Sequence, residues 1–251
     1  MKRLLGIGLL GACVLFAAVA ANAALVRVNG LVLTADGGFT PRDLPRQSYA
    51  PIDFRGTANL KRVGGGAPPP LQQLILDFDR DGKLTTAGIP VCQPATVEGA
   101  TPEEARARCS NAIVGTGHVE ALISTSSGAL PASSPLTLFN GPPQEGNPTV
   151  VLHAQTTVPA LQTIVVTVPI ERRPGWYRYR ATLNLPPIAG GLGAITHLDA
   201  AIGKQYRYRG RERSYASARC SDGVLRTHGR FVFGDGTIID GVVEKGCTVR
   251  R

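Results

Sequence analysis

Residues 74–117 read LILDFDRDGKLTTAGIPVCQPATVEGATPEEARARCSNAIVGTG and carry the most informative features of the chain. They combine an apolar strand, an aspartate-rich turn, a GIPVC corner at 88–92, a helix start and two cysteines. Thr101 is followed at once by Pro102 and three positions on by Glu104, which is the pattern of a capping box at a helix N-terminus. The pattern predicts a helix of about three turns to Ala112.

The first 23 residues have the pattern of a secretory signal peptide. Lys2 and Arg3 precede an apolar run over 4–20, and the letters ANA at 21–23 form a small-x-small cleavage site. We therefore expect a secreted or cell-envelope protein with no membrane span after processing. The alternative is a lipoprotein anchored through Cys13, because LGAC at 10–13 loosely resembles a lipid-attachment box. Against it, the residues after Cys13 are apolar and not a polar tether.

The chain beyond residue 117 alternates apolar and polar residues between turn residues, as antiparallel strands do. We predict an all-β fold with one short helix, either an antiparallel β-sandwich or a Greek-key barrel. Residues 24–51 should form an N-terminal hairpin, turning at Asn29-Gly30, followed by an extended loop over 34–51. Residues 52–251 should form a single β-sandwich domain. Turns are expected at residues 140–143 and at the three Asp-Gly pairs of 222–223, 235–236 and 240–241.

Four cysteines remain after removal of the leader, and they are Cys92, Cys109, Cys220 and Cys247. An even number in an exported chain indicates disulfides, for which three pairings are possible. Sequence proximity favours Cys92–Cys109 and Cys220–Cys247. A zinc site is the alternative, but the sequence has no CxxC pair and only His228 lies near a cysteine.

The aspartate-rich turn matches the first half of a calcium-binding loop. Asp77, Asp79 and Asp81 stand at the first, third and fifth positions, a glycine stands at the sixth, and Lys83 would offer its backbone carbonyl. The bidentate acid that closes such a loop is replaced by Gly88. The missing ligand could come from Glu98, Glu103 or Glu104. Calcium is thus the one possible cofactor, and the alternative is an ordinary Asp/Gly turn between two strands.

A doubled Tyr-Arg-Tyr-Arg motif suggests an anion-binding surface, in a chain whose formal net charge is +9. On a strand, alternation would put the tyrosines on one side and the arginines on the other. The candidate anion-binding residues are Arg178, Arg180, Arg207, Arg209, Arg211 and Arg213. Such a stripe could hold an anionic envelope polymer, with nucleic acid the less favoured partner. The alternative is a sheet with an aromatic core and a merely soluble basic exterior, because a basic stripe alone carries no specificity.

Several parts of the sequence resemble a set of exported bacterial proteins with no assigned function. The similar segments are GIPVC at 88–92, ARARCSNAIVGTG at 105–117, FNG at 139–141 and YASARCSDG at 215–223. The resemblance spans about residues 54–247 and implies a β-rich, disulfide-bonded, exported protein without implying an activity. In that family the segment before GIPVC often lacks the full aspartate triplet, which would make a calcium loop a local variation.

No catalytic motif is present in the sequence, which has no GxSxG, no HExxH and no Gly-rich phosphate loop. The first functional hypothesis is therefore a non-enzymatic, exported β-domain protein that acts as an envelope-associated binding module. The alternatives are an envelope hydrolase with a cryptic site and a calcium-stabilised carbohydrate-binding protein. The sequence does not specify the ligand or the oligomeric state.

Overall fold

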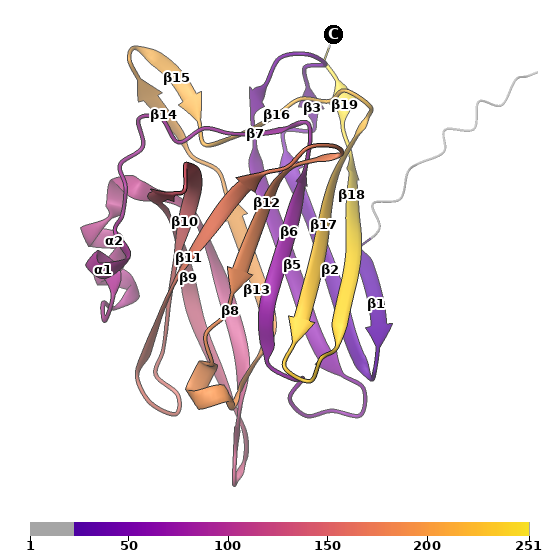
Figure 1. The fold of residues 1–251 in the computed structure, drawn as a ribbon, viewed down its shortest axis with the longest axis vertical. Coiled ribbons are helices and arrows are strands. Elements are labelled where there is room, and N and C mark those ends of the chain that lie inside the picture. The colour runs from indigo at the N-terminus through magenta and orange to yellow at the C-terminus, as the bar shows by residue number, and fades with distance from the viewer. Residues whose placement is uncertain (1–22, 251) are drawn as a thin grey trace, which may run out of the picture.

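The computed structural model describes residues 23–250 and is dominated by one antiparallel sheet of twelve strands (Figure 1). In chain order the strands are β1 (Ala24–Val28), β2 (Leu31–Thr40), β5 (Asp53–Arg62), β6 (Leu71–Asp79), β8 (Ile113–Thr125), β9 (Gly128–Gln144), β10 (Asn147–Thr156), β11 (Gln162–Arg172), β12 (Tyr177–Asn184), β13 (Gly193–Ile202), β17 (Val224–Phe233) and β18 (Ile238–Gly246). The predicted signal peptide, apart from Ala23, and Cys13 lie outside the described residues. None of the described helices is long and apolar enough to cross a membrane.

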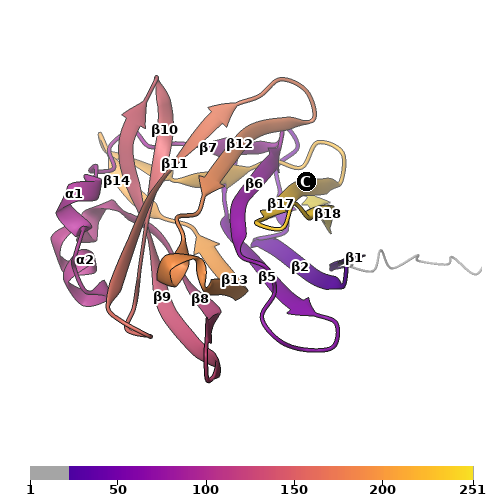
Figure 2. The same ribbon diagram turned by 60° about the horizontal axis from the view of Figure 1, so that its bottom comes forward.

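The sheet curls on itself until its two edge strands meet. Its strand order is β1-β2-β5-β13-β8-β9-β10-β11-β12-β6-β17-β18, and β1 lies beside β18 in a nearly closed, barrel-like shape (Figures 1 and 2). The prediction of an all-β antiparallel fold is confirmed. Strand β6 is inserted between β12 and β17, so residues 71–79 pair with residues that lie at least 98 positions further along the chain.

Short elements gather at one end of the sheet, at the top of Figure 1. They are β3 (Asp43–Leu44), β4 (Ala50–Pro51), β7 (Gly82–Leu84), β14 (Gln205–Tyr208), β15 (Arg211–Ser214), β16 (Ala216–Ala218) and β19 (Thr248–Val249). Strands β4, β16 and β7 form a small sheet, β19 pairs with β3, and β14–β15 is a projecting hairpin. This end also carries many arginines, so we call it the cationic end. The one-turn helix η2 (Ile188–Gly191) lies at the opposite end.

The predicted helix forms on the outer side of the sheet, against β9 and β10. It is α2 (Pro102–Arg108), preceded by the short α1 (Pro94–Val97) and continued by the single turn η1 (Ser110–Ala112). The capping box is present: Glu104 N–H donates to Thr101 Oγ1 at 3.2 Å, and Thr101 N–H donates to Glu104 Oε2 at 2.8 Å. Both helices cover buried Phe139 and Val151 of the sheet.

The Asn29-Gly30 hairpin is confirmed, with φ of 49° and 75° at the two residues, as this kind of two-residue turn requires. The extended loop predicted from Thr34 is wrong in its first part, because β2 continues to Thr40. Every residue of β2 pairs with β5, from Leu31 opposite Arg62 to Thr40 opposite Asp53. The neighbouring strand thus supplies hydrogen bonds that outweigh the turn-like composition of this segment.

Two predicted turns are strand interiors. Strand β9 runs through Gly141, where an added β carbon would collide with the Thr149 side chain on β10. The predicted turn at Asp240-Gly241 lies inside β18, with Asp240 opposite Arg230 of β17. Gly141 allows a close contact with β10, whereas Gly241 lies beside open space, and neither reverses the chain; sequence composition does not distinguish these roles.

Both predicted disulfides are confirmed, with S–S distances of 2.03 Å for Cys92–Cys109 and 1.98 Å for Cys220–Cys247. The first ties the GIPVC corner to the C-cap of α2, and the second ties the segment before β17 to the residue that follows β18. The FNG segment holds the same corner, because Asn140 Nδ2 donates to the carbonyls of Ile89 and Pro90 at 3.3 and 3.1 Å. Two disulfides fit an extracellular protein.

Removing the Cys92–Cys109 bond tests its contribution. We expect the double variant Cys92→Ala, Cys109→Ala to lose about 3 kcal/mol of unfolding free energy, because an open loop gains conformational entropy when the chain unfolds. Urea denaturation followed by circular dichroism measures this. The double variant Cys220→Ala, Cys247→Ala is the matched control and should lose a similar amount. No loss in the first variant would contradict the expectation.

Candidate functional site

The aspartate segment (Asp77–Asp81) covers the end of β6 and the turn after it, and its three carboxylates are buried. Asp77 is 3% exposed and accepts two hydrogen bonds from Arg180 of β12, Nε to Oδ1 at 2.7 Å and Nη2 to Oδ2 at 2.8 Å. On its other side, Asp77 Oδ2 lies 3.2 Å from His228 Nδ1 of β17. This carboxylate therefore connects the two strands that flank β6 on the outer face of the sheet.

The other two carboxylates have partners of their own. Asp79 accepts from the backbone N–H groups of Asp81 and Arg226 at 2.8 and 2.9 Å, and the Arg226 guanidinium lies 3.8 Å away. Asp81 accepts from Arg219 Nε at 2.8 Å and from the Ser221 N–H at 2.7 Å. The segment YASARCSDG, which carries part of the family resemblance, thus folds over the aspartate turn.

The predicted calcium ligands therefore diverge toward different partners. A calcium ion bound by Asp77 and Asp81 would have to displace Arg180 and Arg219 from their oxygens. Lys83, the fourth predicted ligand, lies on β7 opposite Ser217. Over residues 23–250 no cluster of three or more His, Cys, Asp or Glu side chains is arranged to hold a metal ion.

Calcium binding stays a prediction with a direct test. If the segment binds calcium, the melting temperature should rise in millimolar calcium relative to a chelator, because a ligand that binds only the folded state stabilises it. Scanning calorimetry measures the shift, and magnesium at the same concentration is the control for ionic strength. An unchanged melting temperature would contradict the prediction.

The pKa values of the three carboxyls move in two directions. Hydrogen bonding by Arg180 outweighs burial and holds the pKa of Asp77 below its ordinary value. Burial alone would raise the pKa of Asp81, but hydrogen bonds from Ser221 and Arg219 outweigh it and lower that pKa. Burial dominates at Asp79 and raises its pKa. Asp77 and Asp81 therefore stabilise the fold when ionised, whereas Asp79 takes up a proton more readily in the fold.

These directions predict acid sensitivity. The contribution of Asp77 and Asp81 is complete above the ordinary aspartate pKa and is lost as the pH falls below about 4. Urea midpoints at pH 7, 4 and 3 should therefore fall more for the wild type than for Asp77→Asn or Asp81→Asn. Asp79→Asn is the matched control and should steepen the loss, because it removes a group that binds its proton more tightly when folded. A flatter profile for Asp79→Asn would contradict the assignment.

A cationic cleft lies beside the aspartate segment at the cationic end. It has a volume of about 500 Å³ and is lined by Tyr49, Lys83, Leu84, Arg172, Arg173, Arg178 and Tyr179. Arg178 Nη1 donates to Tyr49 Oη at 2.5 Å, and the charged groups of Lys83, Arg178 and Arg219 lie 5.3–5.6 Å from the Tyr49 ring centroid. Tyr49 thus gathers three cations around one ring.

The cations of this cleft are mostly free of acidic partners. Arg173 lies 4.0 Å from Glu171, but no described carboxylate lies within 4.0 Å of the charged groups of Lys83, Arg172 or Arg178. Tyr49, Arg172, Arg173 and the Lys83 side chain were not among the residues predicted from the sequence. The Arg172-Arg173 pair could have been found, because only three residues separate it from the first Tyr-Arg-Tyr-Arg motif, whereas Tyr49 gives no such signal.

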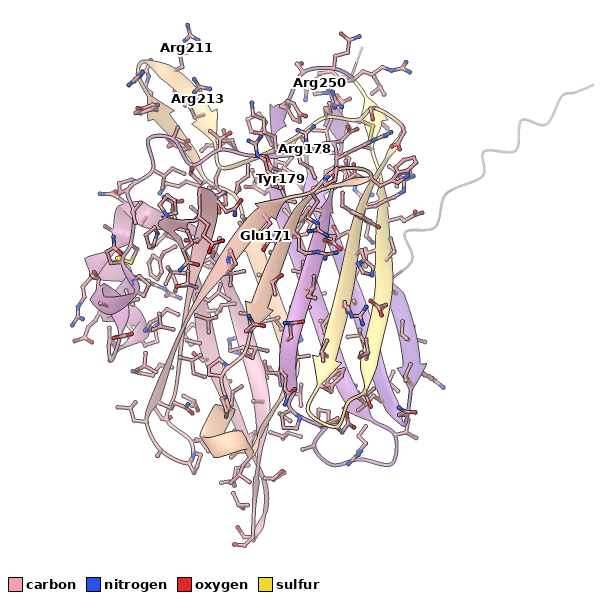
Figure 3. All side chains as sticks on the ribbon, viewed as in Figure 1. Glu171, Arg178, Tyr179, Arg211, Arg213 and Arg250 are labelled. Atoms are coloured by element: carbon pink, nitrogen blue, oxygen red, sulfur yellow. A yellow bond between two sulfur atoms is a disulfide. The ribbon has the colours of Figure 1, made fainter. Side chains whose placement is uncertain are left out.

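The fold divides the six predicted anion-binding arginines between separate surfaces. Arg178 lines the cleft, but Arg180 is engaged by Asp77. The other four lie on the projecting hairpin, and Figure 3 shows Arg211 and Arg213 there, at the same end as Arg178. Binding of one anionic polymer by all six stays a prediction.

Within the hairpin, alternation does not keep tyrosines and arginines apart. Tyr206 pairs with Arg213 and Tyr208 with Arg211, so these arginines share the tyrosine face, whereas Arg207 pairs with Glu212 on the other. Arg209 is in the turn, with φ of 50°. The Tyr208 ring packs directly against Gly88, because a β carbon at Gly88 would collide with the ring. This contact holds the hairpin against the GIPVC corner.

The ring nitrogens of two histidines, His197 and His228, are taken up by contacts within the fold. Both ring nitrogens of His228 face carboxylates, Asp77 at 3.2 Å and Asp240 at 3.3 Å. His197 is bonded likewise, through Nδ1 to Asn59 at 2.9 Å and Nε2 to Asp199 at 3.2 Å. Neither imidazole has a nitrogen left to activate a serine or cysteine.

No family model matches the chain, and neither a curated protein nor a solved structure matches it.

Proposed function

We propose that the protein is an exported, non-enzymatic β-domain protein whose cationic cleft binds anionic groups of a cell-envelope polymer. The observation that carries this proposal is the convergence of Lys83, Arg172 and Arg178 on one cleft with no described carboxylate within ion-pair distance. Like charges held together without counterions repel one another, and an anion relieves that repulsion. Guanidinium groups suit phosphate and carboxylate because they can donate two parallel hydrogen bonds.

The cleft is also held in place before any ligand arrives. Tyr49 positions Arg178 by a hydrogen bond, and Lys83 lies on β7, which is paired with β16. Cations fixed by a folded framework lose less conformational freedom on binding than cations on free side chains. This arrangement supports a binding site over a merely soluble basic exterior.

The proposal includes the absence of catalysis. It is supported by the occupied ring nitrogens of His197 and His228 and by the lack of a catalytic motif in the sequence. Export is supported by the leader pattern and by the two disulfides, which fit an oxidising compartment.

Salt-dependent binding to immobilised polyphosphate tests the cleft. The triple variant Lys83→Gln, Arg172→Gln, Arg178→Gln should elute at clearly lower salt. The negative slope of log affinity against log salt should become shallower by roughly two units, because each lost phosphate contact removes about 0.7 from its magnitude. A carboxylate polymer, polygalacturonate, serves as the second probe. Melting temperatures verify that each variant is folded.

The hairpin supplies a control with the same change in charge. The triple variant Arg207→Gln, Arg211→Gln, Arg213→Gln also removes three positive charges, but from the exposed hairpin. It should keep most of the salt-sensitive binding. Equal losses in the two triple variants would show that net charge alone governs retention, and the cleft would then have no specific role.

A further inference from the structure

The inner side of the barrel-like sheet lines a partly open apolar cavity of about 260 Å³. It lies among the inner faces of β2, β5, β6, β13, β17 and β18 and reaches the edge strand β1. Its apolar walls include Phe39, Phe54, Leu76, Phe78, Leu198 and Val243. A cavity lined in this way offers water few hydrogen-bonding partners, so it suits an apolar occupant.

Small residues on the inner face create this space. They are Ala35, Gly56, Ala58, Ala200, Gly229 and Gly241. A β carbon added at Gly56 would meet only Phe54 Cε1, at 3.8 Å, and one added at Gly241 would meet only Ala24 and Val26, at 3.6 and 3.7 Å. Neither glycine has a positive φ, so the backbone does not require glycine at either position. The cavity is therefore a property of the side-chain choice, and larger residues would fill it.

The cavity and the cationic cleft are neighbours. Both are lined by Lys83, Leu84 and Tyr179. Strand alternation on β12 directs Arg178 outward to the cleft and the buried Tyr179 inward, and Figure 3 shows the two side by side. The Leu84 N–H donates to Tyr179 Oη at 3.4 Å, which fixes the ring in the shared wall. An anion in the cleft and an apolar chain in the cavity would thus be separated by this wall alone.

We propose that the cavity binds the alkyl chain of an anionic amphiphile, a fatty acid or an anionic lipid, whose carboxylate or phosphate lies in the cleft beside Lys83 and Arg178. The placement of the head group rests on the proposed anion binding by the cleft. An engineered cavity of about 150 Å³ takes up benzene, and in proportion this cavity has room for a chain of about ten carbons. Such a ligand would pass from the cleft to the cavity at Tyr179 and Leu84, which line both spaces.

Cavity-filling variants test the chain site. Decanoate is the probe, and its affinity for the full mature chain is measured by calorimetry. Gly56→Leu and Gly241→Leu should each weaken decanoate binding at least tenfold, whereas Ala129→Leu, which places a leucine at an exposed position on β9, should leave it unchanged. Wild-type binding should show a negative heat-capacity change, because apolar surface is buried. Melting temperatures at or above the wild-type value would show that the filled variants are folded.

The outcomes separate this inference from the proposed function. Unchanged decanoate affinity in both filled variants overturns the cavity site, whatever the polyphosphate result. Loss of decanoate binding with intact polyphosphate binding supports the cavity site and leaves the cleft as proposed. If polyphosphate does not bind the wild type but decanoate does so in a cavity-dependent way, the proposed function fails and the chain site stands.

Two further experiments test the position of the head group and the source of the ligand. Lys83→Gln, Arg178→Gln should weaken binding of decanoate but not of uncharged decanol, and equal effects on both would overturn the head-group placement. Incubation with phosphatidylglycerol vesicles and reisolation of the protein tests a lipid source. Recovered lipid supports an anionic lipid, and its absence with bound decanoate supports a free fatty acid.

Discussion

Three buried carboxylates fix where β6 sits in the sheet, and the rest of the structure depends on that position. Backbone hydrogen bonds alone do not specify register, and a slip of one residue would turn every side chain of a strand to the other face. Asp77 meets Arg180 across 103 positions of sequence, and Asp81 meets Arg219 across 138. A register that left such a carboxylate buried without its partner would cost several kcal/mol. The charge pairs therefore select one arrangement of distant strands.

The position of β6 also determines what lies inside and outside the sheet. With Asp77 outward, Leu76 and Phe78 face the cavity, and Tyr179 of β12 does the same. Just beyond the first residue of β1, Lys245 Nζ of β18 lies 2.6 Å from Asp36 Oδ1 of β2 and links these two strands directly. An empty cavity of 260 Å³ would cost roughly 6 kcal/mol at about 24 cal/mol per Å³. That is a large part of the 5–15 kcal/mol by which domains are stable, so retaining the space is consistent with a use for it.

The sequence predicted features whose cause is local and missed those whose cause is distant. The Asn29-Gly30 turn, the Thr101–Glu104 capping box and the two disulfide loops depend on nearby residues, and all are present. Gly141 and Gly241 were predicted as turns because composition does not show whether a glycine serves a turn, a close contact or a cavity. Alternation correctly put Arg178 and Tyr179 on opposite faces. It could not show that Arg180 forms an ion pair with Asp77, or that Tyr49, from a distant loop, lines the cleft.

The cationic end of the sheet is more ordered than a merely soluble surface requires. At the cationic end, β7 is paired with β16, β19 with β3, and Cys220–Cys247 ties β17 to β18 (Figure 1). Surface charge keeps a protein soluble without any of this order, because solubility depends on net charge and not on where each cation lies. Geometry matters only when several cations must meet one ligand at once, since misplacement then weakens every contact. The fixed positions of Lys83 and Arg178 are therefore what the proposed anion binding requires, and the cavity that shares Tyr179 with the cleft would accommodate a chain attached to that anion.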